Sequence, residues 1–209
     1  MEKNKAPIEK KELEKASLIE KRNNNNILLI STSKETFHEE EFVRPIEDIA
    51  KKFAKVHRKR ICSISPEELG SDFYSLIIIC GTSLLDNQFD KCITNLKEIK
   101  HLEKPILGIC AGMQIIAKIY GIPLVQFRQI GFIEFIYKNK KKQGYFLHTR
   151  AVAVQDIAKN RMFECMSSDI NKKYCFGFKH KNKEIMGLLF HPEVRNKEIL
   201  EEFIKNNKN

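Results

Sequence analysis

Short apolar runs alternate with amphipathic segments through the first half of the chain. Four runs have the length and apolar character of buried strands: ILLIS (27–31), RICSI (60–64), LIIIC (76–80) and PILGI (105–109). Three segments space their apolar residues as a helix does: 41–56, 89–101 and 111–120. Gly121 and Pro123 end the last of them. This alternation predicts a parallel sheet flanked by helices.

The pattern changes beyond about residue 131. The apolar runs FIEFIY, YFLHTRAVAV and IMGLLF are separated by Lys-rich or Gly-containing turns, which favours antiparallel strands, and a closing helix follows at about 196–206. Residues 1–22 are polar and residues 23–26 are four asparagines, typical of a linker. We therefore expect a polar N-terminal appendage over residues 1–26, disordered or loosely docked, and one α/β domain over residues 27–209.

Charge adds little to this picture. The formal net charge is +10, which would suit nucleic acid or an acidic partner, but lysines are spread over the whole chain. The lysine clusters at 138–142 and 179–183 lack interleaved aromatic residues, so we interpret them as solvated turns and expect no nucleic-acid partner. No run approaches the ~18 apolar residues of a membrane span, and the N-terminus lacks the apolar core of a signal peptide.

The six cysteines contain no CxxC pair. In a chain of 209 residues this spacing indicates neither a disulfide framework nor a zinc site. We therefore expect free thiols, no metal, and a cytoplasmic protein without a membrane partner.

One cysteine has a distinctive position. Cys110 lies where the strand PILGI ends and the next helix begins, with Gly108 and Gly112 two residues away on either side and Ala111 next to it. Ligands bind beyond the carboxyl ends of parallel strands, and a sharp strand-to-helix turn with small neighbours presents its central side chain as a nucleophile. The helix N-terminus favours the thiolate, and its amides can hold an oxyanion.

A cysteine nucleophile needs a base. His191 follows the apolar run IMGLLF and begins the sequence HPEV, in which Glu193 lies two residues further on. In an extended segment these two side chains project to the same side, so Glu193 can orient the imidazole. Cys110, His191 and Glu193 thus become candidates for nucleophile, general base and orienting carboxylate.

GICAGMQ and LLFHPEV together resemble the two signatures of class I glutamine amidotransferases of the Cys-His-Glu type, in the order and separation found in that family. The resemblance covers residues 27–206. It implies a flavodoxin-like three-layer sandwich with a mostly parallel central sheet, and extra antiparallel strands in the C-terminal half. It also implies a glutaminase: Cys110 attacks the glutamine side-chain amide, His191 protonates the leaving ammonia, and water hydrolyses the glutamyl thioester.

The resemblance assigns further roles to residues around this triad. The oxyanion would meet the amide of Ala111 and backbone of the loop after LIIIC, at Gly81 and Thr82. Gln114, the last residue of the first signature, would hold the substrate, as would His148 in YFLHTRAV. The loop departs from the family pattern, because relatives carry S-G-G-P where this chain has CGTS. The second glycine is Thr82 here, which makes the loop less permissive.

Such domains usually supply ammonia to a synthase, and this chain contains no ATP-binding P-loop. We therefore expect no cofactor here, and a separate synthase subunit that binds ATP and magnesium. The stretch CFGFKHKNKEIMGLLFHPEV is most similar to the glutaminase subunit of a two-part GMP synthase. Alternatives are the glutaminase subunit of imidazole-glycerol-phosphate synthase, a γ-glutamyl hydrolase and a catalytically weak regulatory subunit.

Overall fold

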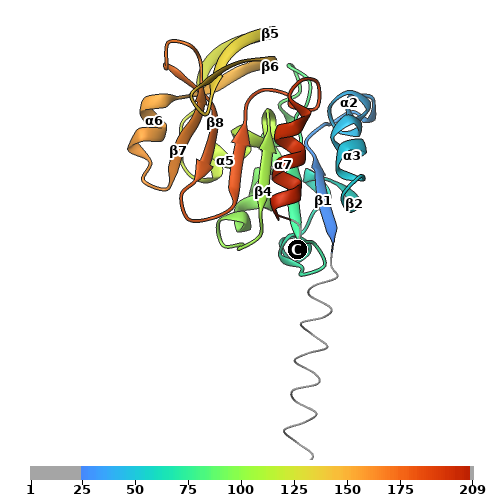
Figure 1. The fold of residues 1–209 in the computed structure, drawn as a ribbon. Coiled ribbons are helices and arrows are strands. Elements are labelled where there is room, and N and C mark those ends of the chain that lie inside the picture. The colour runs from blue at the N-terminus through green and yellow to red at the C-terminus, as the bar shows by residue number, and fades with distance from the viewer. Residues whose placement is uncertain (1–24, 208–209) are drawn as a thin grey trace, which may run out of the picture.

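The computed structural model describes residues 25–207 (Figure 1). The predicted appendage therefore lies outside the described residues, except for its last two positions. Strands and helices follow one another in this order: β1 (Asn26–Ser31), α2 (Thr36–Phe42), α3 (Arg44–Ala50), β2 (Lys55–Arg60), η1 (Ile61–Ser63), α4 (Pro66–Gly70), β3 (Leu76–Ile79), η2 (Gln88–Lys100), β4 (Ile106–Ile109), α5 (Ala111–Ile119), β5 (Val125–Tyr137), β6 (Lys140–Ala153), α6 (Val154–Lys159), β7 (Phe163–Ser168), β8 (Tyr174–His180), β9 (Ile185–Leu188) and α7 (Lys197–Asn207).

The strands form one mixed sheet in the order β2-β1-β3-β4-β9-β8-β6-β5-β7. The pairs from β2 to β9 are parallel, and those from β9 to β7 are antiparallel. Strand β7 also pairs with β8, which folds the antiparallel part back on itself. The α/β class is thus confirmed, but the antiparallel part is larger than the prediction of a mostly parallel sheet, because β5 and β6 are long strands and β7 and β8 join them.

Helices cover both faces of the parallel half. Helix α7 contacts α3 on one face, and α5 contacts η2 on the other. Figure 1 shows α7 in front of the sheet and α5 behind it. Strands β3, β4 and β9 are buried at every position, as expected for strands enclosed between two helical layers. Within the part of the chain that the structure describes, no helix is long and apolar enough to cross a membrane.

Two elements near the N-terminus differ from prediction. The second strand is Lys55–Arg60, upstream of the predicted RICSI, where residues 61–63 form a short 3-10 turn instead. Among residues 25–207 it pairs with β1 alone, at the edge of the sheet, and its partly exposed side chains are polar except for Val56. The single helix predicted over 41–56 is replaced by α2 and α3, which meet at Val43 just before Pro45.

The prediction of free thiols is wrong for one pair. Cys62 and Cys92 form a disulfide with an S–S distance of 2.00 Å, which joins η1 to η2. The two cysteines are 30 residues apart in sequence. The sequence contains no local motif for this pairing, because the pairing depends on the packing of η1 against η2. Within residues 25–207, the remaining thiols are free: Cys80, Cys110, Cys165 and Cys175.

Candidate active site

The turn between β4 and α5 is strained at Cys110. Its backbone dihedrals, φ of 52° and ψ of −104°, lie outside the regions that residues other than glycine normally adopt. Its neighbours are glycines for steric reasons. A Cβ at Gly112 would lie 2.1 Å from the carbonyl oxygen of Ile79, and one at Gly108 would lie 2.5 Å from the carbonyl carbon of Gly112. The Cys110 amide donates to the Leu188 carbonyl at 2.7 Å, which ties the turn to β9. The turn therefore has the sharp geometry that the sequence predicts.

His191 and Glu193 lie just beyond β9 and are almost completely buried, at 1% and 3% exposure. The Nδ1 atom of His191 lies 2.7 Å from Oε1 of Glu193. A carboxylate only accepts, so Nδ1 carries the proton and the other ring nitrogen is left for chemistry. The backbone amide of His191 donates to the Tyr145 carbonyl at 2.8 Å, which anchors the segment to β6.

The structure brings Cys110 and His191 to the same place. Gly81, in the loop after β3, touches both: a Cβ there would lie 3.1 Å from Cβ of Cys110 and 3.0 Å from Cε1 of His191. Burial lowers the pKa of His191, but the Glu193 carboxylate and the Cys110 thiol together raise that pKa well above its usual value. The protonated imidazole of His191 is therefore favoured by the two groups on either side of it.

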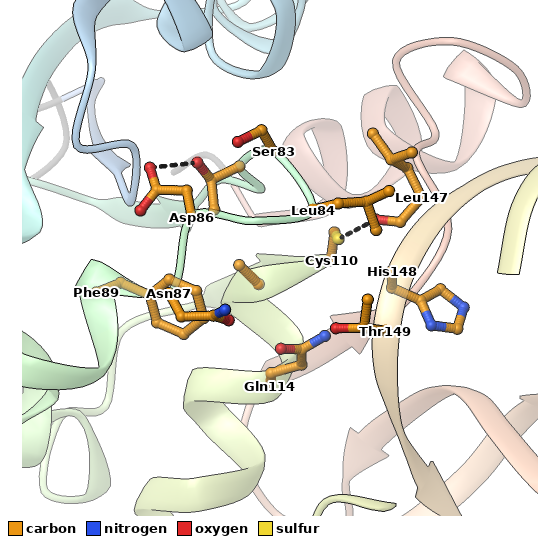
Figure 2. A pocket seen from close by; sticks show the side chains of 12 residues that line it. Ser83, Leu84, Asp86, Asn87, Phe89, Cys110, Gln114, Leu147, His148 and Thr149 are labelled. Atoms are coloured by element: carbon orange, nitrogen blue, oxygen red, sulfur yellow. Dashed lines mark hydrogen bonds between the residues drawn. The ribbon is translucent and has the colours of Figure 1, made fainter. Parts of the chain in front are cut away.

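A small, shallow pocket opens beside Cys110. Its walls come from the loop after β3, the start of η2, the first turns of α5, and β6 (Figure 2). The Cys110 sulfur lies 3.4 Å from the Leu147 carbonyl oxygen. Ala111 lines the pocket in the first turn of α5, where backbone amides have no partner within the helix. The pocket thus combines a thiol with polar groups that suit a small amide.

Gln114 lines this pocket and is 5% exposed. Its Nε2 donates to the Arg150 carbonyl at 3.1 Å. The Arg150 guanidinium in turn binds Asp90 at 3.0 Å and Asn87 at 2.8 Å, both at the start of η2. The sequence alone assigns Arg150 no role, because no local signal shows that β6 approaches η2. This residue fixes one wall of the pocket.

His148 borders the pocket, yet its ring points away from Cys110 in Figure 2. The ring packs near Phe127, Phe146 and Phe176, and Nδ1 donates to the Phe127 carbonyl at 3.0 Å. Burial lowers the pKa of His148 to about 4, so the imidazole is neutral at pH 7. Its predicted contact with substrate stays a prediction.

Stability should fall with acid because of His148. Its pKa is about 4 in the folded chain and about 6.5 when unfolded, so between these values the unfolded state binds the extra proton. We expect this group to lower the free energy of unfolding progressively from pH 6.5 to 4, by about 3 kcal/mol in total. The variant H148N tests this expectation, because the asparagine side-chain amide can donate in place of Nδ1 but does not titrate. Urea unfolding at pH 7.5, 5.5 and 4.5 measures the free energy of unfolding. Between pH 7.5 and 4.5 this free energy should fall less in H148N than in wild type, and an equal fall would contradict the lowered pKa of His148.

Comparisons with known proteins identify relatives of this chain. The profile of the family "Glutamine amidotransferase class-I" matches residues 46–208. The chain is 30% identical over 185 residues to a glutamine-hydrolysing GMP synthase of Wigglesworthia glossinidia brevipalpis. This match covers 76% of this chain and 34% of that protein. It is 28% identical over 138 residues to one subunit of the glutamine-hydrolysing GMP synthase of Picrophilus torridus, covering 61% of this chain and 71% of that subunit. The chain therefore spans about a third of the length of the first relative and most of the second.

Two solved structures share the fold. A protein of Thermoplasma acidophilum, provisionally described as one subunit of a GMP synthase, aligns with a TM-score of 0.70 at 20% identity over 86% of this chain and 92% of that one. A glutamine amidotransferase of Thermotoga maritima aligns with a TM-score of 0.59 at 19% identity, over 89% of this chain and 92% of that one. The family profile covers most of the chain. The chain therefore belongs to the class-I glutamine amidotransferase family.

Proposed function

We propose that this chain hydrolyses the side-chain amide of glutamine through a Cys110 thioester and supplies the ammonia to a separate ATP-dependent synthase, a GMP synthase. The observation that carries the proposal is the strained turn at Cys110, set beside an imidazole that Glu193 holds at 2.7 Å. Backbone strain at a single residue persists where the surrounding structure imposes it, and such residues are common at active sites.

The first half of the reaction forms the thioester. The Cys110 thiolate attacks the amide carbon of glutamine, and the carbonyl oxygen becomes an oxyanion. Amides of Ala111 and of the Gly81–Thr82 backbone are the proposed oxyanion donors. His191 then gives its proton to the amide nitrogen, the C–N bond breaks, and ammonia leaves.

The second half releases glutamate. Neutral His191 takes a proton from water, and the hydroxide attacks the thioester carbon. The C–S bond breaks and the Cys110 thiolate returns beside the protonated imidazole. Through both halves Glu193 keeps the proton on Nδ1, so that Nε2 performs each transfer.

The proposed partner rests on the relatives. One of them is named as a single subunit of a GMP synthase, and this chain covers 71% of it. The other is a glutamine-hydrolysing GMP synthase of which this chain matches only 34% of the length. The relative named as a single subunit supports a glutaminase that works with a separate synthase subunit.

A glutamine-analogue electrophile tests the site. The diazoketone 6-diazo-5-oxo-L-norleucine should alkylate Cys110 with loss of N₂, and glutamine should protect the thiol. Cys165, another free and partly exposed thiol, is the internal control and should remain unlabelled on peptide mapping. Equal labelling of the two cysteines, or labelling that glutamine does not slow, would contradict the proposal. Ammonia released from free glutamine separates a glutaminase from a hydrolase that acts only on γ-glutamyl peptides.

A further inference from the structure

The loop after β3 contains a buried hydroxyl where relatives are expected to carry a second glycine. Thr82 is 3% exposed, and its Oγ1 lies 3.0 Å from Oδ2 of Asp86 and 3.1 Å from Oγ of Ser33. A hydroxyl has one hydrogen and a carboxylate only accepts. Thr82 therefore donates to Asp86 and accepts from Ser33, which bridges its own loop to the segment after β1.

The same two segments are joined on either side of this bridge. Asp86 Oδ2 accepts the Lys34 amide at 2.7 Å, and Oδ1 accepts the Gln88 amide at 3.2 Å. Oγ1 of Thr32 lies 3.1 Å from the carbonyl oxygens of both Cys80 and Gly81. Thr32 and Asp86 are themselves buried, and hydrogen bonds shielded from water hold their geometry strongly. We call this set of contacts the Thr82 clamp.

The position of this loop matters for the proposed reaction. Gly81 lies so close to Cys110 and His191 that an added Cβ would come within 3.1 Å of both, so a shift of the loop alters the space in which an oxyanion would form. Oxyanion donors act only if they are already in place when charge develops. A loop with two glycines has little intrinsic stiffness, whereas this loop carries a side chain that fixes it from within.

We propose that Thr82 is a positioning residue for this site: through Asp86 and Ser33 its hydroxyl holds the Gly81–Thr82 backbone beside Cys110 in the arrangement that stabilises the oxyanion. The inference rests on the proposed glutaminase function. It explains how the loop works without the second glycine and the proline. Thr82 acts through the backbone and does not need to touch the substrate.

The test compares T82V, which removes the hydroxyl but keeps the shape, with T82S, which keeps the hydroxyl. T82V should lower kcat for glutamine hydrolysis by about 10- to 100-fold, less than full loss of an oxyanion donor, with KM within about threefold. T82S should recover most of the rate. Amide hydrogen exchange over residues 81–88 should be at least about tenfold faster in T82V, because the loop loses the two buried hydrogen bonds of the Thr82 hydroxyl.

The matched control is S167A on β7. The buried Ser167 hydroxyl donates to the Ile136 carbonyl at 2.9 Å, in the antiparallel half of the sheet. This variant loses a comparable hydrogen bond and should keep the wild-type kcat. The rate at which iodoacetamide alkylates Cys110 should be the same in wild type, T82V and S167A, because the clamp acts on the oxyanion and leaves the thiolate unchanged.

Three results would overturn the inference: a wild-type kcat in T82V, an equal loss of kcat in T82V and S167A, or slower alkylation of Cys110 in T82V in proportion to its kcat. A wild-type chain that hydrolyses no glutamine would contradict the proposed function instead. In that case the exchange of the loop amides still decides whether Thr82 holds the loop.

Discussion

C110A is expected to abolish glutamine hydrolysis, with a fall in kcat of at least about 10⁴-fold. The thiolate forms the only covalent bond to the substrate in the proposed reaction, and alanine offers no nucleophile. The substitution leaves the pocket walls at Gln114 and Thr149 in place, so glutamine should still bind. Ammonia release and glutamine binding by calorimetry measure the two effects separately.

C110G serves as the control for the backbone. Glycine adopts positive φ without strain, so C110G should be more stable than C110A by about 1 kcal/mol in urea unfolding while being equally inactive. Residual turnover in C110A within tenfold of wild type would remove Cys110 from the mechanism. A C110G variant no more stable than C110A would show that the turn is not strained.

G112A is expected to destabilise the whole domain, by about 3 kcal/mol or more. The added methyl group would lie 2.1 Å from the carbonyl oxygen of Ile79 and 2.8 Å from its carbonyl carbon. Both are backbone atoms of a buried strand, and neither can move aside as a flexible side chain can. Helix α5 must therefore shift away from β3, which also displaces Cys110.

G70A is the matched control for this substitution. Gly70 ends α4 on the surface, and a Cβ there would meet nothing within 4 Å. Thermal and urea unfolding of the two variants should differ strongly, with G70A close to wild type. If G112A unfolds at the wild-type urea concentration, the close approach of α5 to β3 described here is wrong.

The central strands and the strained turn could be predicted because their signals are local. Strands β3 and β4 are short apolar runs, and the turn shows its two glycines directly around Cys110. Edge strand β2 could not be recognised in this way, since KVHRKR is polar and pairs on one side only. Strand β5 begins at Val125, earlier than the apolar run FIEFIY suggests, because Gln126, Arg128 and Gln129 make its first part largely polar.

Contacts between distant segments carry no such signal. The Cys62–Cys92 disulfide, the Thr82 clamp and the Arg150–Asp90 ion pair each join side chains from elements that meet only after folding. Their residue types are common, and a single sequence does not show which partner each will find. The candidate nucleophile, base and carboxylate were therefore predictable, whereas the residues that hold the surrounding walls were not.

The position of β9 has a consequence for synthesis on the ribosome. Among the described residues this strand is the last to be translated, yet it occupies the middle of the sheet between β4 and β8. Until it emerges, two interior strands present open edges, which invite pairing with other chains. His191 and Glu193 follow directly behind it, so a nascent polypeptide can acquire neither a closed sheet nor the proposed catalytic triad before residue 193 has emerged from the ribosome.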